Sequence, residues 1–171
     1  DLMASRWAYE ALATDQFKNN EYQATYFNYE KEEAKADFKT AFIADDLKRR
    51  NLFILQNLDT KSDSIKEIIN SHLGIIREVL THEPFKPGFE KVNLAEDFSV
   101  KNYTKLRGGI LDNYIEEYRK HYQKIYNDNV LLIEKRMTFD EKNGININEE
   151  KNKYYNESLA DLVKNVTVKE R

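Results

Sequence analysis

The three histidines of this chain are the side chains best suited to proton transfer or metal binding. They stand at His72, His82 and His121, and the last two each follow a glutamate, Glu78 and Glu117, by four residues. A carboxylate-bridged dimetal bundle instead needs Glu-x-x-His, a spacing of three, on two helices together with further inward glutamates. The sequence therefore predicts surface pairs at these positions and no metal site.

Other candidates for catalysis are few. Asp112, Glu116 and Glu117 are close in sequence, but they lie off the apolar stripe of their segment, which predicts solvated carboxylates. The chain has no cysteine, and this excludes thiol catalysis, disulfides and thiolate zinc sites. We expect no catalytic residue, no metal ligand and no cofactor site within this chain.

A ladder of tyrosines is the strongest candidate for binding. Tyr114, Tyr118, Tyr122 and Tyr126 recur every four residues, which places their rings along one side of a helix. Such rings could form a contact face for a partner or an apolar compound. The same spacing is typical of a helical core edge, where the ring is buried and the hydroxyl reaches water. The sequence leaves both interpretations open.

Two adjacent glycines, Gly108 and Gly109, interrupt the chain just before this ladder. They lack the third glycine, the lysine and the preceding strand of a phosphate-binding loop. The pair therefore predicts a helix break or a hinge for a moving arm, and not a nucleotide site.

The composition predicts an all-α protein that does not bind nucleic acid. The chain has 171 residues, of which 33% are charged and 40% hydrophobic, with only five glycines and two prolines. Such a chain suits long helices with narrow apolar stripes better than sheets with many tight turns. The net charge of -3 and the pI near 5.7 argue against a nucleic-acid surface, which normally carries a basic excess.

Apolar residues at spacings of three and four define the predicted helices. These cover residues 3–17, 22–58 with a break near 44–46, 64–80, 94–106, 111–137 and 148–166. Ser64 with Glu67 resembles a capping box at the start of the third helix. A turn is expected at 142–144 because Asn143 precedes Gly144 there.

We expect one helical domain over residues 1–171. It divides into an amphipathic segment 1–20, a first half 21–83, a loop 84–92 that holds both prolines, and a second half 93–171. The second half carries a near-heptad seam of Leu111, Ile115, Tyr118, Tyr122, Ile125, Asn129, Leu132 and Arg136. A seam this narrow predicts an elongated antiparallel bundle with long coiled-coil-like hairpin arms, in which Asn129 fixes the helix register or bonds a partner helix.

The chain itself has no segment that could cross a membrane. A spanning helix needs about 20 mostly apolar residues, and the longest unbroken aliphatic run is 130–133. No signal-peptide pattern opens the sequence, and its first residue is Asp1 rather than methionine. We therefore expect a fragment of a longer protein.

The first residues carry a resemblance to a known family. The residues that carry it are Ser5, Arg6, Trp7, Ala8, Tyr9, Glu10, Ala11 and Leu12, followed by Phe17 and two asparagines. They resemble a segment that follows the fifth transmembrane helix in ABC transporter permeases of the G subfamily, just before the large external loop. Residues 158–165 are loosely similar to the bacterial members that fuse the ATPase and the permease in one chain.

This resemblance implies the enlarged external loop of an ABC exporter. The domain would lie on the extracytoplasmic, periplasmic side of the inner membrane, over the exit of the transport path. Its partners would be the transmembrane and ATPase domains of the parent, and a second transporter copy or a periplasmic protein. ATP and Mg would belong to the parent, because this chain has neither the Walker A motif nor the signature sequence.

A different class of protein stays open. The chain could be a cytoplasmic helical scaffold or adaptor that associates through its heptad seam. Hydrophobic spans of about 20 residues on both sides of the fragment would favour the exporter over the scaffold.

Overall fold

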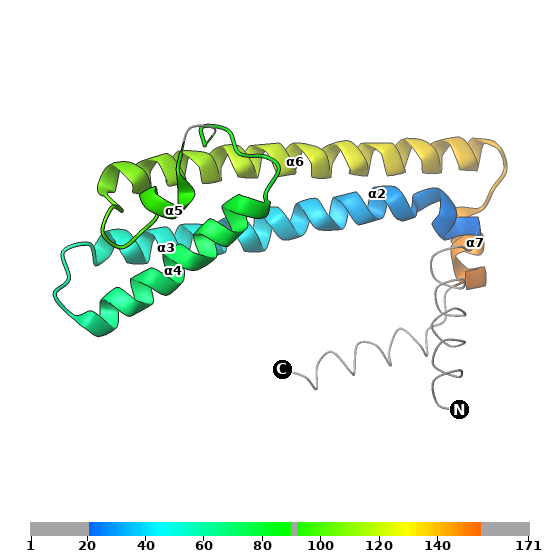
Figure 1. Cartoon of the computed structure of the whole chain (residues 1–171). Coiled ribbons are helices and arrows are strands. Elements are labelled where there is room, and N and C mark those ends of the chain that lie inside the picture. Colours follow the sequence, from blue (N-terminus) through cyan, green and yellow to red (C-terminus); the bar gives the residue numbers. More distant parts are fainter. Residues whose placement is uncertain (1–20, 90–91, 155–171) are drawn as a thin grey trace, which may run out of the picture. The chain divides into compact units, whose positions relative to one another are not determined.

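The computed structural model describes residues 21–89 and 92–154, and in these ranges the chain is helical without a strand (Figure 1). The elements are α2 (Glu21–Phe38), η1 (Lys39–Ile43), α3 (Ala44–Gln56), α4 (Asp63–His82), α5 (Leu94–Asp97), α6 (Lys105–Lys142) and α7 (Ile147–Tyr154). The prediction of an all-α fold is confirmed. The predicted helix 3–17, the family-like segment 5–12 and the tail 158–165 lie outside the described residues.

The chain divides into two compact units. The described part of the first, which we call the terminal unit, combines residues 21–32 with 128–154. The second, the central unit, comprises Glu33–Asn127. The predicted division at the loop 84–92 does not match these units. The loop lies inside the central unit, and the terminal unit takes segments from both predicted halves.

The core of the central unit forms where α3, α4 and the first half of α6 bury their apolar stripes. Helix α4 packs against α3, and its buried residues Ile69, Leu73, Ile76 and Leu80 follow the expected spacing of three and four. Leu111 and Ile115 of α6 join the same cluster, each 1% exposed or less. Full burial of each such side chain contributes about 1.5–3 kcal/mol, so this cluster holds the central unit together.

The break predicted near 44–46 takes the form of a π-helical turn. Residues 39–43 form η1, and the chain enters and leaves this turn with ordinary helical dihedral angles at Phe38 and Ala44. The wider turn accommodates one more residue than an α-helical turn, which rotates the side chains before it relative to those of α3. The helix therefore continues through the predicted break, and the turn directs Lys39 into the unit.

Three predicted helix boundaries are wrong. Helix α4 begins at Asp63 after Ser62, with no side-chain cap, so the capping box at Ser64 does not form. The predicted helix 94–106 is only the single turn α5, capped by the Asn93 side chain. Helix α6 then begins at Lys105 and continues through both glycines, so the predicted break at Gly108 and Gly109 is absent.

The ends of α6 and α4 agree with the sequence. Helix α6 ends at Lys142, and Gly144 takes a φ of 82°, which only glycine adopts without cost. Helix α4 ends at His82, two residues before the first proline, in keeping with the extended backbone favoured there. None of the described helices is both long and apolar enough to span a membrane.

Candidate functional site

A buried polar cluster of the central unit surrounds Glu83, the residue that follows α4. Its side chain is only 6% exposed. Its carboxylate accepts hydrogen bonds from Lys39 Nζ at 2.9 Å, from the Tyr118 hydroxyl at 3.3 Å, and from the Tyr122 hydroxyl. The backbone N–H of Phe85 donates a further bond at 3.3 Å. A buried carboxylate with this many donors is fully satisfied, and it ties η1, the loop and α6 to one point.

The electrostatics of the cluster favour the charged forms of both ions. Burial of Glu83 opposes its ionisation, but the hydrogen bonds from Tyr122 and Lys39 outweigh burial and lower the pKa of its carboxyl group. Burial also disfavours the Lys39 cation, and bonds to Tyr122 and Glu83 more than compensate, so the pKa of Lys39 is raised. Burial and the Glu83 charge raise the pKa of Tyr118, which keeps its hydroxyl protonated.

The loop that follows Glu83 is fixed against α6 by aromatic contacts. Phe85 stacks on His121 with ring centroids 3.8 Å apart and an interplanar angle of 3°. The Tyr114 hydroxyl donates to the Phe85 carbonyl at 3.1 Å, and the Tyr114 ring meets Phe89 edge-on. The predicted Glu117–His121 pair is therefore wrong, since Glu117 instead pairs with Lys120 at 2.8 Å.

The tyrosine ladder lies in the core. Tyr114, Tyr118 and Tyr122 are 2%, 0% and 7% exposed, and half-buried Tyr126 packs against the same cluster. Of the two interpretations left open by the spacing, the structure favours the core edge. The first three rings are not free to form a contact face for a partner, because they are buried and their hydroxyls already bond Glu83, the loop and η1.

Gly108 has a packing role in place of the predicted hinge. A Cβ atom at this position would lie 2.6 Å from Leu55 Cδ2, so glycine allows α6 to approach α3 closely. The carbonyl of Gly108 accepts a hydrogen bond from the Asn51 side chain at 2.9 Å. Gly109 faces open space, since nothing lies within 4 Å of its Cβ position. The two neighbouring glycines therefore have different surroundings.

A second buried network centres on Asn51, which is fully buried. Its amide donates to the Gly108 carbonyl and, at 2.8 Å, to Asp112, and its carbonyl oxygen accepts from the Tyr103 hydroxyl at 2.6 Å. Every polar atom of this side chain therefore has a partner. Asp112 was predicted to be solvated, and although it is exposed, one oxygen takes part in this network.

The terminal unit contains a pocket of about 250 Å³. Tyr22, Tyr26, Arg136, Asp140, Ile147 and Glu150 are among its lining residues. The buried Asp140 accepts from the Tyr26 hydroxyl at 2.8 Å and pairs with Arg136 at 3.0 Å. Burial and this bond to Asp140 raise the pKa of Tyr26. The polar groups of Tyr26, Arg136 and Asp140 thus bond to one another, as in a structural contact.

Within residues 21–89 and 92–154 no group of acidic or histidine side chains could hold a metal ion. His72 lies against Phe53, with ring centroids 4.9 Å apart, and burial lowers the pKa of its imidazole. Sequence reasoning missed Lys39 and Glu83, because a lysine and a glutamate 44 residues apart give no local signal.

Comparison with known proteins adds no relative. No family model, curated protein or solved structure matches this chain.

Proposed function

We propose that this chain is an extracytoplasmic helical domain of an ABC-type exporter, inserted between the last two transmembrane helices of its parent. The family-like residues 5–12 suggest the parent. Gating of substrate release or docking of a periplasmic protein at the exit would be its task. ATP, Mg and all catalysis would belong to the ATPase domains of the parent.

One feature of the fold carries the proposal. Tyr22, at the start of the described chain, and Ile147 and Glu150, near its end, line the same pocket of the terminal unit. The chain therefore enters and leaves through one unit, while residues 33–127 form the other. An insert between two adjacent membrane helices needs such neighbouring ends, because a distant pair would force the helices apart.

The geometry also suits a domain whose role is structural, with a fixed arrangement of helices, and not one that converts a substrate. The buried ions and amides around Glu83 and Asn51 are satisfied by partners from several elements. Such networks fix one arrangement of helices and leave no unpaired nucleophile at their centre. This supports a gating or docking role in which the central unit acts as a preformed body.

Membrane topology of the full-length parent tests this proposal. Single cysteines would replace Asn143, in the exposed turn after α6, and Lys66, on the exposed side of α4, after removal of any other cysteines. A maleimide that cannot cross the inner membrane would be added to cells with a permeabilised outer envelope. We expect both cysteines to react in these cells. We also expect both to react in sealed inner-membrane vesicles whose outer surface is the periplasmic face.

The cytoplasmic scaffold is the alternative outcome. Labelling of both cysteines only after lysis would reject the exporter and favour a scaffold. The structure changes how that scaffold would associate, since Leu111, Ile115, Tyr118 and Tyr122 of the seam are buried inside the central unit. Association would have to use exposed apolar side chains such as the stacked pair Phe38 and Phe42.

A further inference from the structure

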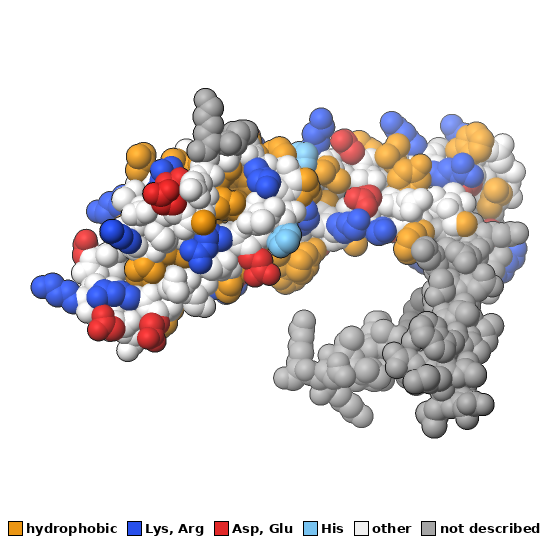
Figure 2. All heavy atoms as spheres, viewed as in Figure 1, with side chains coloured by type: hydrophobic (Ala, Val, Ile, Leu, Met, Phe, Trp, Pro, Cys, Tyr) orange, Lys and Arg blue, Asp and Glu red, His pale blue; other side chains and the backbone are white. Residues whose placement is uncertain are grey.

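The last turns of α6 expose an unusual set of side chains, which we call the basic-apolar face. It consists of Leu131, Leu132, Lys135, Phe139 and Lys142. The three apolar side chains are 50%, 43% and 58% exposed, in chain order. Figure 2 shows hydrophobic and basic side chains interleaved over this end of α6. All five residues belong to the terminal unit.

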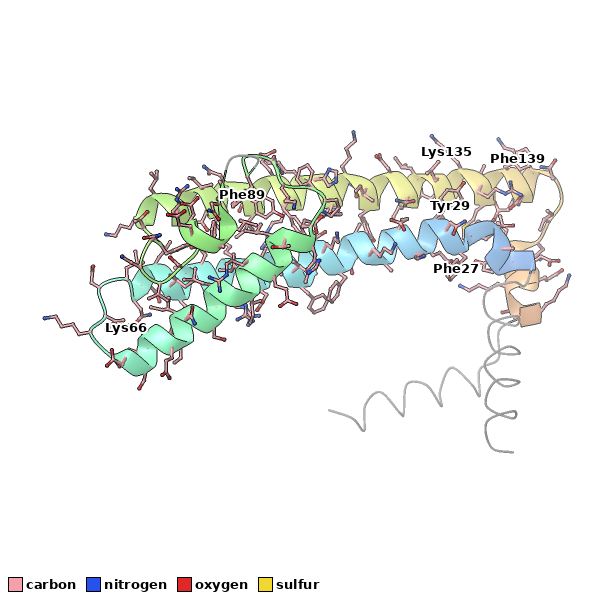
Figure 3. All side chains as sticks on the ribbon, in the orientation of Figure 1. Phe27, Tyr29, Lys66, Phe89, Lys135 and Phe139 are labelled. Atoms are coloured by element: carbon pink, nitrogen blue, oxygen red, sulfur yellow. The ribbon has the colours of Figure 1, made fainter. Side chains whose placement is uncertain are left out.

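Helix geometry places the five side chains on one side of α6, in the same sector as the exposed Asp128 one turn earlier. With about 100° of rotation per residue, the five fall within a sector of about 100°. Glu134 and Glu141 lie together at about 60–80° beyond the nearer edge of that sector. The buried Asp140 points to the opposite side, where it meets Tyr26. Figure 3 shows Lys135 and Phe139 on the side of α6 away from Tyr29 and Phe27 of α2.

The two lysines of the face have no ion-pair partner among the described residues. The nearest basic neighbour, Arg136, is instead engaged with Asp140 and lies 5.6 Å from the centre of the Phe139 ring. A shallow groove along the face is lined by Leu131, Glu134, Lys135, Thr138, Phe139 and Lys142. The face therefore presents two cations beside large apolar groups.

We propose that the basic-apolar face binds the surface of an anionic phospholipid bilayer. Lysine can lay its aliphatic stem along apolar surface while its ammonium group meets phosphate, and leucine and phenylalanine enter the boundary between headgroups and acyl chains. The inference rests on the proposed function. If residues on both sides of the terminal unit lead into membrane helices, this unit is the one next to the bilayer. The contact would hold the base of the domain against the membrane.

Vesicle sedimentation of the 171-residue chain tests this binding. We expect the protein to sediment with vesicles of phosphatidylglycerol and phosphatidylcholine, and much less with phosphatidylcholine alone. The double variant K135Q/K142Q should bind the anionic vesicles roughly 25-fold more weakly, since each lysine near an anionic surface contributes about fivefold. Higher salt should also weaken binding, and millimolar inorganic phosphate should not compete, because the bilayer and not the free anion is the ligand.

Control variants in the central unit distinguish binding by the basic-apolar face from non-specific adsorption of the protein to vesicles. The pair L131Q/F139Q should reduce binding at least tenfold. The control L106Q/F42Q removes one exposed leucine and one exposed phenylalanine elsewhere, and K66Q/K120Q removes two exposed lysines. Both controls should bind as the unchanged chain does. Equal losses in test and control variants, or no binding to anionic vesicles, would overturn the inference.

This experiment and the topology experiment fail in different ways. Loss of vesicle binding leaves cysteine labelling from the outer side unaffected, and the exporter proposal then stands without the membrane contact. Labelling only after lysis would reject the exporter even if the purified chain binds vesicles. Circular dichroism of every variant would show that the helices remain formed.

Discussion

At the scale of single residues, the buried carboxylate of Glu83 is the group on which most of the polar structure depends. It collects Lys39, Tyr118 and Tyr122, which are supplied by η1 and α6. A charged acceptor with neutral and cationic donors forms stronger hydrogen bonds than a neutral pair. Loss of its charge should therefore weaken the contacts of several elements at once.

Glu83→Gln should lower the free energy of unfolding by about 1–3 kcal/mol at pH 7, because Lys39 loses its anionic partner. Urea denaturation monitored by circular dichroism would measure the change. Glu116→Gln is the matched control, since Glu116 is exposed and its contact with Lys48 is long, at 3.5 Å. An equal effect of both substitutions would contradict a special role for Glu83.

The same residue predicts a pH dependence of stability. Because folding lowers the pKa of Glu83 from an ordinary value of 4.5, its contribution is complete above pH 4.5 and is lost as the pH falls through the folded-state pKa. The unfolding free energy of the unchanged chain should thus fall in acid more steeply than that of Glu83→Gln. Parallel curves for the two proteins would show that other carboxyl groups cause the decline.

Tyr103→Phe tests the second network. The substitution removes one donor and leaves the carbonyl oxygen of the fully buried Asn51 without its bond of 2.6 Å. We expect a loss of about 1–2 kcal/mol in urea denaturation, the usual cost of an unsatisfied buried polar atom. Tyr29→Phe, at a half-buried position of the terminal unit, serves as a control and should change stability by less.

At the scale of elements, alanine substitutions at the two adjacent glycines of α6 distinguish a packing role of glycine from a role in helix flexibility. Gly109→Ala should raise the free energy of unfolding by about 0.5–1 kcal/mol, because alanine favours the helix and its methyl group meets nothing. Gly108→Ala should be at least about 1 kcal/mol less stable than Gly109→Ala, since its methyl group must displace Leu55. Thermal denaturation of both variants checks the order.

Equal stabilisation by the two alanines would mean that α3 and α6 do not meet closely at Gly108. If the full-length protein is the proposed exporter, Gly109→Ala should leave its transport unchanged. Impaired transport by this stable variant would restore the hinge that the sequence alone suggested.

The π-helical turn η1 should be needed for the Lys39 contact. Deleting Ala41, an exposed residue inside the turn, would return the segment to α-helix and rotate Lys39 by about 100° relative to α3. We expect a loss of at least about 2 kcal/mol, because the ion pair and the packing of Ala36 change together. Ala41→Ser keeps the turn and should cost less than about 1 kcal/mol.

At the scale of the whole molecule, the two units should differ in local stability. Among the residues that the structure describes, the ten largest fully buried side chains, from Leu47 to Tyr118, all lie in the central unit. Amide hydrogens therefore should exchange more slowly in α3, α4 and the first half of α6 than in α7 and the last turns of α6. Hydrogen exchange with mass spectrometry would measure this order, and uniform protection would contradict it.

The sequence by itself determined the all-α class, most of the described helices, the loop that follows α4 and the turn at 142–144. These features depend on local signals: apolar spacing, few glycines, and prolines or Asn-Gly at the ends. The same local information misplaced the break at Gly108 and Gly109. Glycine weakens a helix by only about 1 kcal/mol, and close packing against Leu55 outweighs that cost.

Only the tertiary structure decided what the tyrosines and the buried ions do. Spacing places Tyr114, Tyr118 and Tyr122 on one side of a helix, but it does not say whether that side meets protein or water. The Glu83 cluster joins Lys39 to residues 44 and 83 positions along the chain, a contact made by the π-helical turn and by folding. Long-range burial and pairing depend on which surfaces meet, and local sequence carries no record of that.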